Sequence, residues 1–231
     1  MYEMITSSVF FGVIISLTAY FIGLGIRRKT GLALMNPILI AVVLVIALLS
    51  ACGIDYETYN QSARMLSALL TPATICLAVP LYEQLQLLIR YKKAILAGIA
   101  SGVITSLCCV FVLALLFGLS HTDYVTLLPK SITSAIGMGV SGELGGHVSV
   151  TVAVIIITGI IGNATAETVL RMFRITEPIA KGIAIGSSSH AIGTTKAMEI
   201  GQVEGAMSSL SIVVSGLLTV AGASLFAGLI G

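Results

Sequence analysis

The sequence predicts an all-α polytopic membrane protein with about seven crossings, or eight if a short central segment also spans. Of its 231 residues, 57% are hydrophobic and only 10% are charged, and the mean hydropathy is +1.07. The charges leave six uncharged runs, at residues 4–26, 30–54, 65–82, 94–120, 144–166 and 205–231. Because a spanning helix needs about 20 apolar residues, six such runs indicate transmembrane helices and disfavour a soluble protein.

The first run is expected to form a transmembrane helix within residues 1–30. It begins MYEM, without a basic start, and shows no small-residue cleavage pattern. Arg27, Arg28 and Lys29 follow it as a stop-transfer flank. These features favour a retained helix over a cleaved signal peptide.

The basic residues gather in three clusters, around Arg27, Arg90 and Arg171. Basic residues in short loops mark the cytoplasmic side of a membrane protein. With the three clusters inside, the N-terminus is predicted outside and the C-terminus in the cytoplasm. The predicted crossings are then at 5–24, 34–51, 65–82, 94–117, 147–163, 179–198 and 206–230.

Two of these crossings are poor continuous helices. Segment 65–82 contains Pro72 and Pro80, and a proline inside a helix removes a backbone hydrogen bond. Segment 179–198 contains GSSSHAIGTTK, which is rich in glycines and hydroxyls. The charge pattern predicts that residues 31–124 and 147–231 form two halves of three helices each. The two halves cross the membrane in opposite directions and form an inverted repeat. Interrupted segments at matching places in such halves point to the substrate site of a transporter. Two kinked but ordinary helices are the alternative.

Residues 125–146 join the two halves and do not fit as a full crossing under the charge rule. They contain small and hydroxyl-bearing residues, as in PKSITSAIGMG. Irregular backbone within the membrane is tolerated only where protein or water supplies hydrogen-bond partners for its N–H and C=O groups. A re-entrant or interfacial element is therefore expected, with a spanning segment as the rival model.

Broken helices expose free N–H groups that attract anions, and neighbouring hydroxyls can bind a carboxylate. The candidate substrate-binding residues are Thr71, Thr74, Lys130, Ser131, Thr133, Ser187, Ser188, Ser189, His190, Gly193, Thr194, Thr195 and Lys196. Two residues, His190 and Glu143, are also candidates for proton coupling. The structural alternatives are a buried histidine, a Lys196 that reaches the interface, and a loop ion pair for Lys130 and Glu143.

Other functional classes find little support in the sequence. Neither a Gly-x-Ser-x-Gly elbow nor a His-Glu-x-x-His or Cys/His cluster occurs, so an enzyme, a metal site and a cofactor are not expected. The net charge of +2 is spread over short loops, which disfavours nucleic-acid binding.

Three stretches closely resemble the LrgB/CidB family, and the resemblance covers about residues 31–231. They are PKSITSAI at 129–136, ELGG at 143–146 and EPIAKGIAIGSSSHAIGTTKAMEIGQVEGAMSSLSIVVSG at 177–216. The chain departs from the family pattern at Ser134 and Ala135, where the family has threonine and proline.

The resemblance implies one of two functions in the bacterial inner membrane. Some members are linked to pyruvate uptake, and a related plastid protein translocates glycolate and glycerate. This implies a secondary transporter of small monocarboxylates such as glycolate, glycerate, pyruvate or lactate. Other members are described as holin- or antiholin-like proteins that modulate murein hydrolase export and autolysis. They work beside a small LrgA/CidA-type membrane partner, for which this chain could also be a scaffold. A homo-oligomer is expected, with a dimer favoured.

Overall fold

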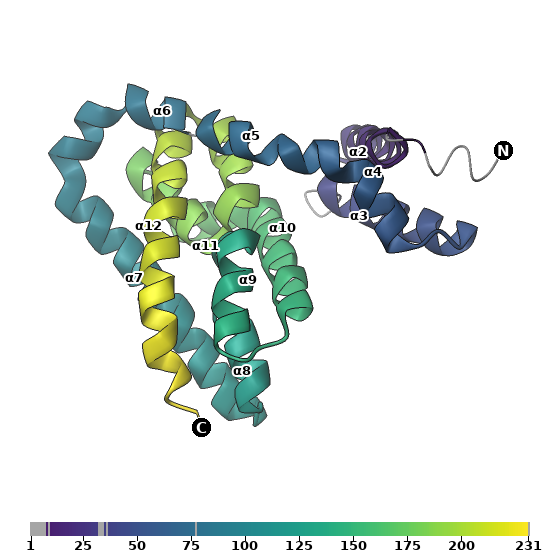
Figure 1. Cartoon of the computed structure of the whole chain (residues 1–231). Coiled ribbons are helices and arrows are strands. Elements are labelled where there is room, and N and C mark those ends of the chain that lie inside the picture. The colour runs from purple at the N-terminus through teal and green to yellow at the C-terminus, as the bar shows by residue number, and fades with distance from the viewer. Residues whose placement is uncertain (1–7, 9, 32–34, 36, 77, 231) are drawn as a thin grey trace. The chain divides into compact units, whose positions relative to one another are not determined.

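A computed structural model describes residues 8, 10–31, 35, 37–76 and 78–230, without the side chains at positions 70, 71, 74, 80 and 81. Every regular element in this described part is a helix, in the order α2 to α12 (Figure 1). Four helices, α2, α7, α10 and α12, are long and apolar enough to cross a membrane. The chain is therefore an all-α polytopic membrane protein, as predicted. It divides into two compact units, Met1–Cys76 and Leu77–Gly231.

The first unit contains the helices α2 (Phe11–Thr30), α3 (Pro37–Cys52), α4 (Tyr56–Ala68) and α5 (Leu70–Cys76). Helices α2 and α3 share an apolar cluster of Ala19, Val45 and Leu49. Helix α4 packs closely on α2 at Gly12, whose backbone N–H donates to the Ser62 hydroxyl over 2.9 Å. A Cβ at Gly12 would lie 2.7 Å from the backbone nitrogen of Ala63, so only glycine allows this approach.

The predicted crossing at 65–82 is divided among three helices in the described residues. Its first residues belong to α4, and Leu69 separates α4 from α5. Pro80 lies in α6 (Ala78–Glu83), which belongs to the second unit. This segment is therefore short helical pieces and not one continuous spanning helix.

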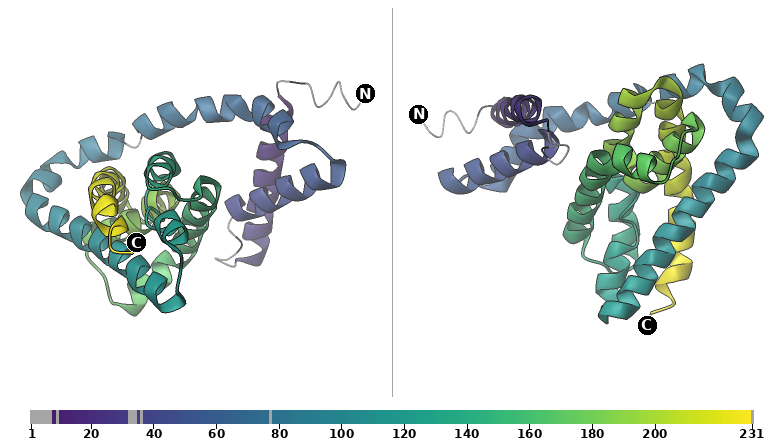
Figure 2. Two further views of the ribbon diagram at one scale, coloured as in Figure 1. Left: turned by 60° about the horizontal axis from the view of Figure 1, so that its bottom comes forward. Right: turned by 180° about the vertical axis from the view of Figure 1, so that it is seen from behind.

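Three long helices frame the second unit: α7 (Leu85–Phe117), α10 (Val148–Met172) and α12 (Gln202–Ala227). Helices α7 and α12 run side by side in the same direction (Figures 1 and 2). The rings of Phe111 and Phe226, near the ends of these helices, have centroids 6.4 Å apart. Helix α10 runs the opposite way. The other helices of this unit fill the space that the three long helices leave.

Helices α8 (His121–Leu127) and α9 (Ser134–Glu143) form a hairpin along α10. At its open end, the Thr151 hydroxyl of α10 donates to the carbonyl of Thr126 over 2.9 Å and to Ser141 Oγ over 2.7 Å. One turn further along α10, Ile155 packs against Gly137 of α9. The hairpin therefore points its tip, residues 128–133, toward the middle of α10.

Helix α11 (Pro178–Ile200) folds back on itself at His190, where the backbone is non-helical with φ 42° and ψ −141°. Gly193 packs against Ile185, eight residues earlier, and a Cβ there would lie 3.3 Å from the Ile185 carbonyl oxygen. Eight residues of straight helix span about 12 Å, so the two halves of α11 must lie against each other. Helix α11 is a second hairpin.

Both ends of α11 lie next to the start of α12 and the end of α10. Gly182, near its start, packs against the backbone of Glu204, and Met198, near its end, packs against Gly205. Similarly, Lys181 and Ile200 line one depression beside the last turns of α10. This differs from the single crossing expected at 179–198. The physical reason is that the reversal at His190 sends the chain back to the end from which it came.

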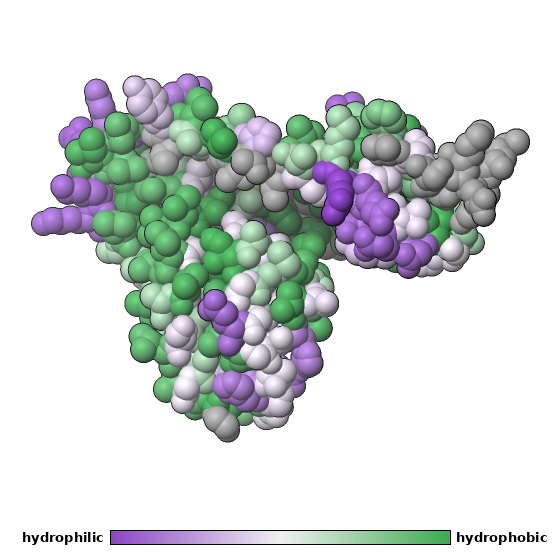
Figure 3. All heavy atoms as spheres, in the orientation of Figure 1, coloured by the Kyte–Doolittle hydropathy of each residue, from purple (hydrophilic) through white to green (hydrophobic). Residues whose placement is uncertain are grey.

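The charges separate along the second unit. One end, which we call the basic end, carries Arg90, Lys92, Lys93, Arg171, Arg174 and Lys181. Apolar side chains cover much of the visible face of the unit, with hydrophilic ones gathered toward its ends (Figure 3). The described residues at the opposite end include no arginine or lysine. Basic residues mark the cytoplasmic side, so the basic end is the expected cytoplasmic end. The side of the membrane on which each terminus lies stays a prediction.

The return of α11 can be tested by the accessibility of single cysteines in a cysteine-free background. We expect Thr176→Cys and Gln202→Cys to react with an impermeant reagent from the same face of the membrane, because both flank α11 at the basic end. Leu229→Cys should react from the opposite face, and Lys92→Cys serves as the control for the basic end. Reaction of Thr176→Cys and Gln202→Cys from opposite faces would show that α11 crosses.

Packing of α11 on α12 depends on Gly186, and its replacement should destabilise the protein. A Cβ at Gly186 would lie 2.8 Å from the Ser208 Cα and 2.8 Å from the Ser211 Cβ, so the backbones must separate. We expect Gly186→Ala to lower the free energy of unfolding by about 1–3 kcal/mol, the usual cost of overpacking. Thermal unfolding in detergent would measure it. The matched control is Gly139→Ala on α9, where a Cβ meets nothing within 4 Å. Equal stability of the two variants would contradict the close packing.

Candidate functional site

The tips of the two hairpins lie at the same level of the three long helices. On α7, Ser106 Oγ lies 3.1 Å from Ser131 Oγ of the first tip. On α10, Ile155 contacts both Gly137 of α9 and the ring of His190. We call the part of the unit around residues 130–133 and 190–192 the tip region. It is a polar centre inside a predominantly apolar unit.

His190 holds the second tip in an unusual conformation. Its positive φ is rare for a residue with a side chain and costs about 1–3 kcal/mol, which the surroundings must offset. The ring Nε2 lies 2.9 Å from the carbonyl oxygen of Ile155 and donates to it, because a carbonyl only accepts. A Cβ at Gly159 would lie 2.7 Å from the ring, so a glycine is needed at this position to leave room for the imidazole. The histidine is 3% exposed.

The carbonyls near the break in α11 are bonded by side chains. Thr194 Oγ1 donates to the His190 carbonyl over 2.9 Å and lies 2.7 Å from Ser208 Oγ of α12. Asn163 of α10 donates from Nδ2 to the carbonyl of Ile192 over 2.8 Å. These side-chain bonds attach the start of the second half of α11 to α10 and α12.

Lys130 and Ser131 carry the polar groups of the first tip. The Lys130 ammonium donates to Ser131 Oγ over 2.9 Å. Thr133 is the N-cap residue of α9, but its hydroxyl accepts no hydrogen bond from the first turn. The structure therefore brings Lys130, Ser131, His190 and Thr194 into one region.

Several other candidates lie away from the tip region. Ser187 is buried against Gly102 of α7 and donates to the carbonyl of Ile183 over 2.7 Å. Ser188 is exposed, whereas Ser189 is buried against Gly162 of α10. All three hydroxyls belong to the first half of α11, before its tip.

The charged candidates Lys196 and Glu143 lie toward the two ends of the unit. Lys196 pairs with Glu199 over 3.1 Å and also with Glu167 of α10. Glu143 is exposed at the end of α9, on the open side of the first hairpin. Thr195, next to Lys196, is exposed and accepts a hydrogen bond from Asn163 over 3.0 Å. Their roles in binding or proton coupling stay predictions.

Thr71 and Thr74 lie on α5 of the first unit, and their side chains are outside the described part of the chain. In that part, no three His, Cys, Asp or Glu side chains gather closely enough to hold a metal ion.

Several polar groups that face the hairpins were not predicted from the sequence. Asn163 was hidden inside an apolar run, and Ser106 is one hydroxyl in a long hydrophobic helix. Helix α12 has buried hydroxyls at a spacing of three or four residues, at Ser208, Ser211, Ser215 and Thr219. This helical period of polar residues in an apolar span was the available signal.

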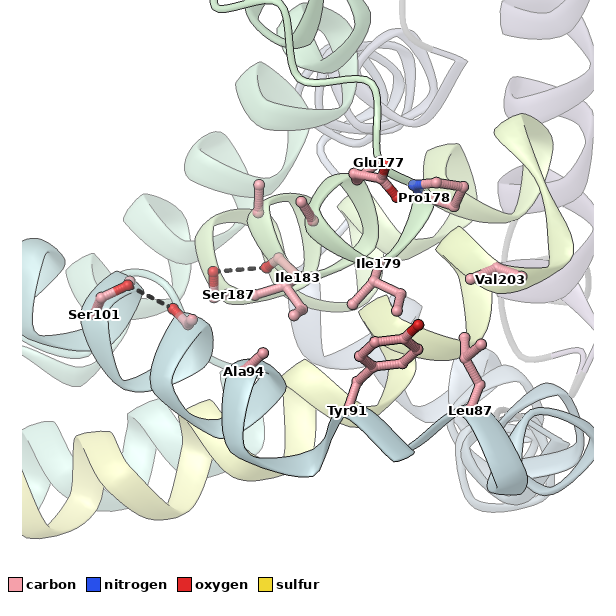
Figure 4. Close-up of a pocket in the computed structure, with 14 residues that line it drawn as sticks. Leu87, Tyr91, Ala94, Ser101, Glu177, Pro178, Ile179, Ile183, Ser187 and Val203 are labelled. Atoms are coloured by element: carbon pink, nitrogen blue, oxygen red, sulfur yellow. Dashed lines mark hydrogen bonds between the residues drawn. The ribbon is translucent and has the colours of Figure 1, made fainter. Parts of the chain in front are cut away.

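One groove of the second unit lies beside the tip region and not within it. It has a volume of about 710 Å³ and lies between α7 and the first half of α11 (Figure 4). Its labelled side chains are mostly apolar, including Leu87, Ile179, Ile183 and Val203, with Tyr91 at one side. Of the predicted site residues, only Ser187 reaches this groove.

Comparisons with known proteins agree with the resemblance seen in the sequence. The model of the LrgB-like family matches residues 16–229. Antiholin-like protein LrgB of Bacillus cereus (strains B4264 and AH187) and that of Bacillus anthracis (strain CDC 684 / NRRL 3495) are each 37% identical to the chain. The match covers 98% of this chain and 99% of each relative. No solved structure gives a significant match. The chain belongs to the LrgB-like family.

Proposed function

We propose that this protein is an antiholin-like protein of the bacterial inner membrane that modulates murein hydrolase export and autolysis. The observation that carries the proposal is the similarity, over nearly the whole of both chains, to relatives named antiholin-like protein LrgB. The apolar spanning helices support a role within the membrane. A small LrgA/CidA-type membrane protein is the proposed partner, and a homodimer is the proposed assembly.

The antiholin-like role predicts slower autolysis when the protein is present. Cells that lack their own LrgB-like protein would express this chain, with and without the small partner. The decline of turbidity after an autolytic stimulus would then be measured. An unrelated polytopic protein expressed to the same membrane level is the control. Autolysis unchanged by this chain, with or without the partner, would contradict the role.

A second candidate function, a carrier of small monocarboxylates, is favoured by a specific feature of the structure. Two hairpins enter the space between α7, α10 and α12, and polar groups of their tips bond to α7 and α10 at one level of the unit. A protein that acts only as a membrane scaffold has no need of buried hydroxyls and a buried imidazole at this depth. Polar groups inside a membrane protein are costly and are therefore candidates for function.

The hairpins also suggest how such a carrier would work. The first half of α11, residues 178–189, would be about 18 Å long, which compares with a half-thickness of about 15 Å for the hydrocarbon core. A substrate at the tip region would therefore lie near the middle of the membrane. Movement of one hairpin against the three long helices would open this region to one side at a time. His190 is the proposed proton-coupling group of the cycle.

The carrier function predicts saturable uptake of labelled glycolate, glycerate, pyruvate or lactate into proteoliposomes. The informative variant is His190→Asn, because asparagine tolerates a positive φ but does not titrate near neutral pH. We expect it to remove the stimulation of uptake by a proton gradient. The control is Thr165→Ala, which removes an exposed hydroxyl of α10 that donates only to the carbonyl of Ile161.

Two results would count against these assignments. The absence of saturable uptake of all four acids, with and without the small partner, would reject the carrier. Uptake by His190→Asn that responds to a proton gradient as the unmodified protein does would reject the role of His190 and keep the carrier.

A further inference from the structure

We propose that the tip region binds one small monocarboxylate, with the Lys130 ammonium as its counter-ion and the Ser215 hydroxyl as a second ligand. The assignment deepens the carrier proposal and rests on it for its transport role. Three independent features carry it: a cation without an acidic partner, an uncapped helix start and a buried hydroxyl without a hydrogen bond.

Lys130 is a partly buried cation that the described residues do not neutralise. Its ammonium donates to Ser131 Oγ over 2.9 Å, and no described carboxylate lies within 4.0 Å of it. By contrast, Lys181 lies 3.9 Å from Glu204, and Lys196 has two acidic partners. A charge removed from water without a partner is costly, so an anion beside Lys130 would be stabilised.

The start of α9 adds hydrogen-bond donors at the same tip. The helix has ten residues, and its first backbone bond inside the helix runs from the Gly137 N–H to the Thr133 carbonyl over 2.8 Å. The Thr133 hydroxyl does not cap the preceding N–H groups of Ser134, Ala135 and Ile136. Free N–H groups and the positive end of the helix dipole both favour an anion.

Ser215 is a separate indication, independent of Lys130 and of the start of α9, that a ligand binds here. Its hydroxyl is the only fully buried side-chain oxygen or nitrogen in the described residues that lacks a hydrogen-bond partner, and the residue is 1% exposed. One turn before it on α12, Ser211 packs against Gly186 of the second hairpin. The next residue, Gly216, packs against Ile136 of the first hairpin. Ser215 thus lies on α12 between its contacts with the two hairpins, where a bound carboxylate would satisfy it.

The chemistry of these groups selects the class of ligand. A single ammonium balances a single negative charge, so a monovalent anion fits better than a divalent one. Directional donors, namely a hydroxyl and backbone N–H groups, suit the two oxygens of a carboxylate. The first tip is also packed against α7, where Ser131 lies within hydrogen-bond distance of Ser106, so the ligand must be small.

The test is equilibrium binding to the purified full chain in detergent, measured by calorimetry with glycolate, pyruvate and chloride as probes. We expect saturable binding of glycolate or pyruvate and weaker binding of chloride. Lys130→Gln should weaken carboxylate binding by about tenfold or more, because it removes a charge-assisted contact, and Ser215→Ala should weaken it about threefold to tenfold. Lys130→Arg keeps the charge and should retain most of the binding.

The matched controls are Lys92→Gln and Ser224→Ala, which change an exposed lysine at the basic end and an exposed hydroxyl on the same helix as Ser215. Both should bind as the unmodified protein does, and thermal unfolding would establish that each variant is folded. Carboxylate binding by Lys130→Gln that equals that of Lys92→Gln would overturn the site. Chloride binding as tight as that of both acids would overturn the ligand class.

Binding and uptake separate this site from the carrier function. Carboxylate binding that depends on Lys130, without uptake into proteoliposomes, would keep the site and reject the carrier. Saturable uptake that Lys130→Gln leaves unchanged would keep the carrier and overturn the site.

Discussion

The second unit depends on one constraint: a backbone that reverses inside a membrane protein must find hydrogen-bond partners within the protein. Side chains bond to the backbone around the reversal of α11 at His190. Thr194 bonds the His190 carbonyl, and Asn163 of α10 bonds the Ile192 carbonyl. The His190 ring in turn donates to the carbonyl of Ile155 on α10. The hairpin is therefore held by the same helices that surround it.

Close packing is the second requirement, and glycines meet it where the hairpins touch the long helices. A side chain at Gly162 would overlap Ser189, and one at Gly182 or Gly186 would meet the backbone of α12. These contacts bring both halves of α11 against the start of α12. As a result, polar side chains of both hairpins lie at one level of the long helices. Ser106, Ser131 and His190 are at this level.

The proposed functions make different use of this architecture. An antiholin-like role follows from the relatives and needs only a stable protein in the membrane with a surface for a partner. A carrier needs the interior: two tips at one level of the unit, a cation that has no acidic partner among the described residues, and hydroxyls along α12. The two roles are compatible, because one uses the interior of the protein and the other its surface.

Composition and the spacing of charges determined the helical class, the membrane location and the long helices α7, α10 and α12, because burial in lipid requires long apolar runs. The sequence also placed Lys130, Ser131, His190 and Thr194 among the candidates, because polar residues in such runs are conspicuous. Only the tertiary structure decided that α11 returns to its own end, that Lys196 pairs with Glu167 and that Ser215 lies between the two tips. Glycine and serine permit a kink, a crossing or a reversal alike. Contacts with α10 and α12 select the reversal.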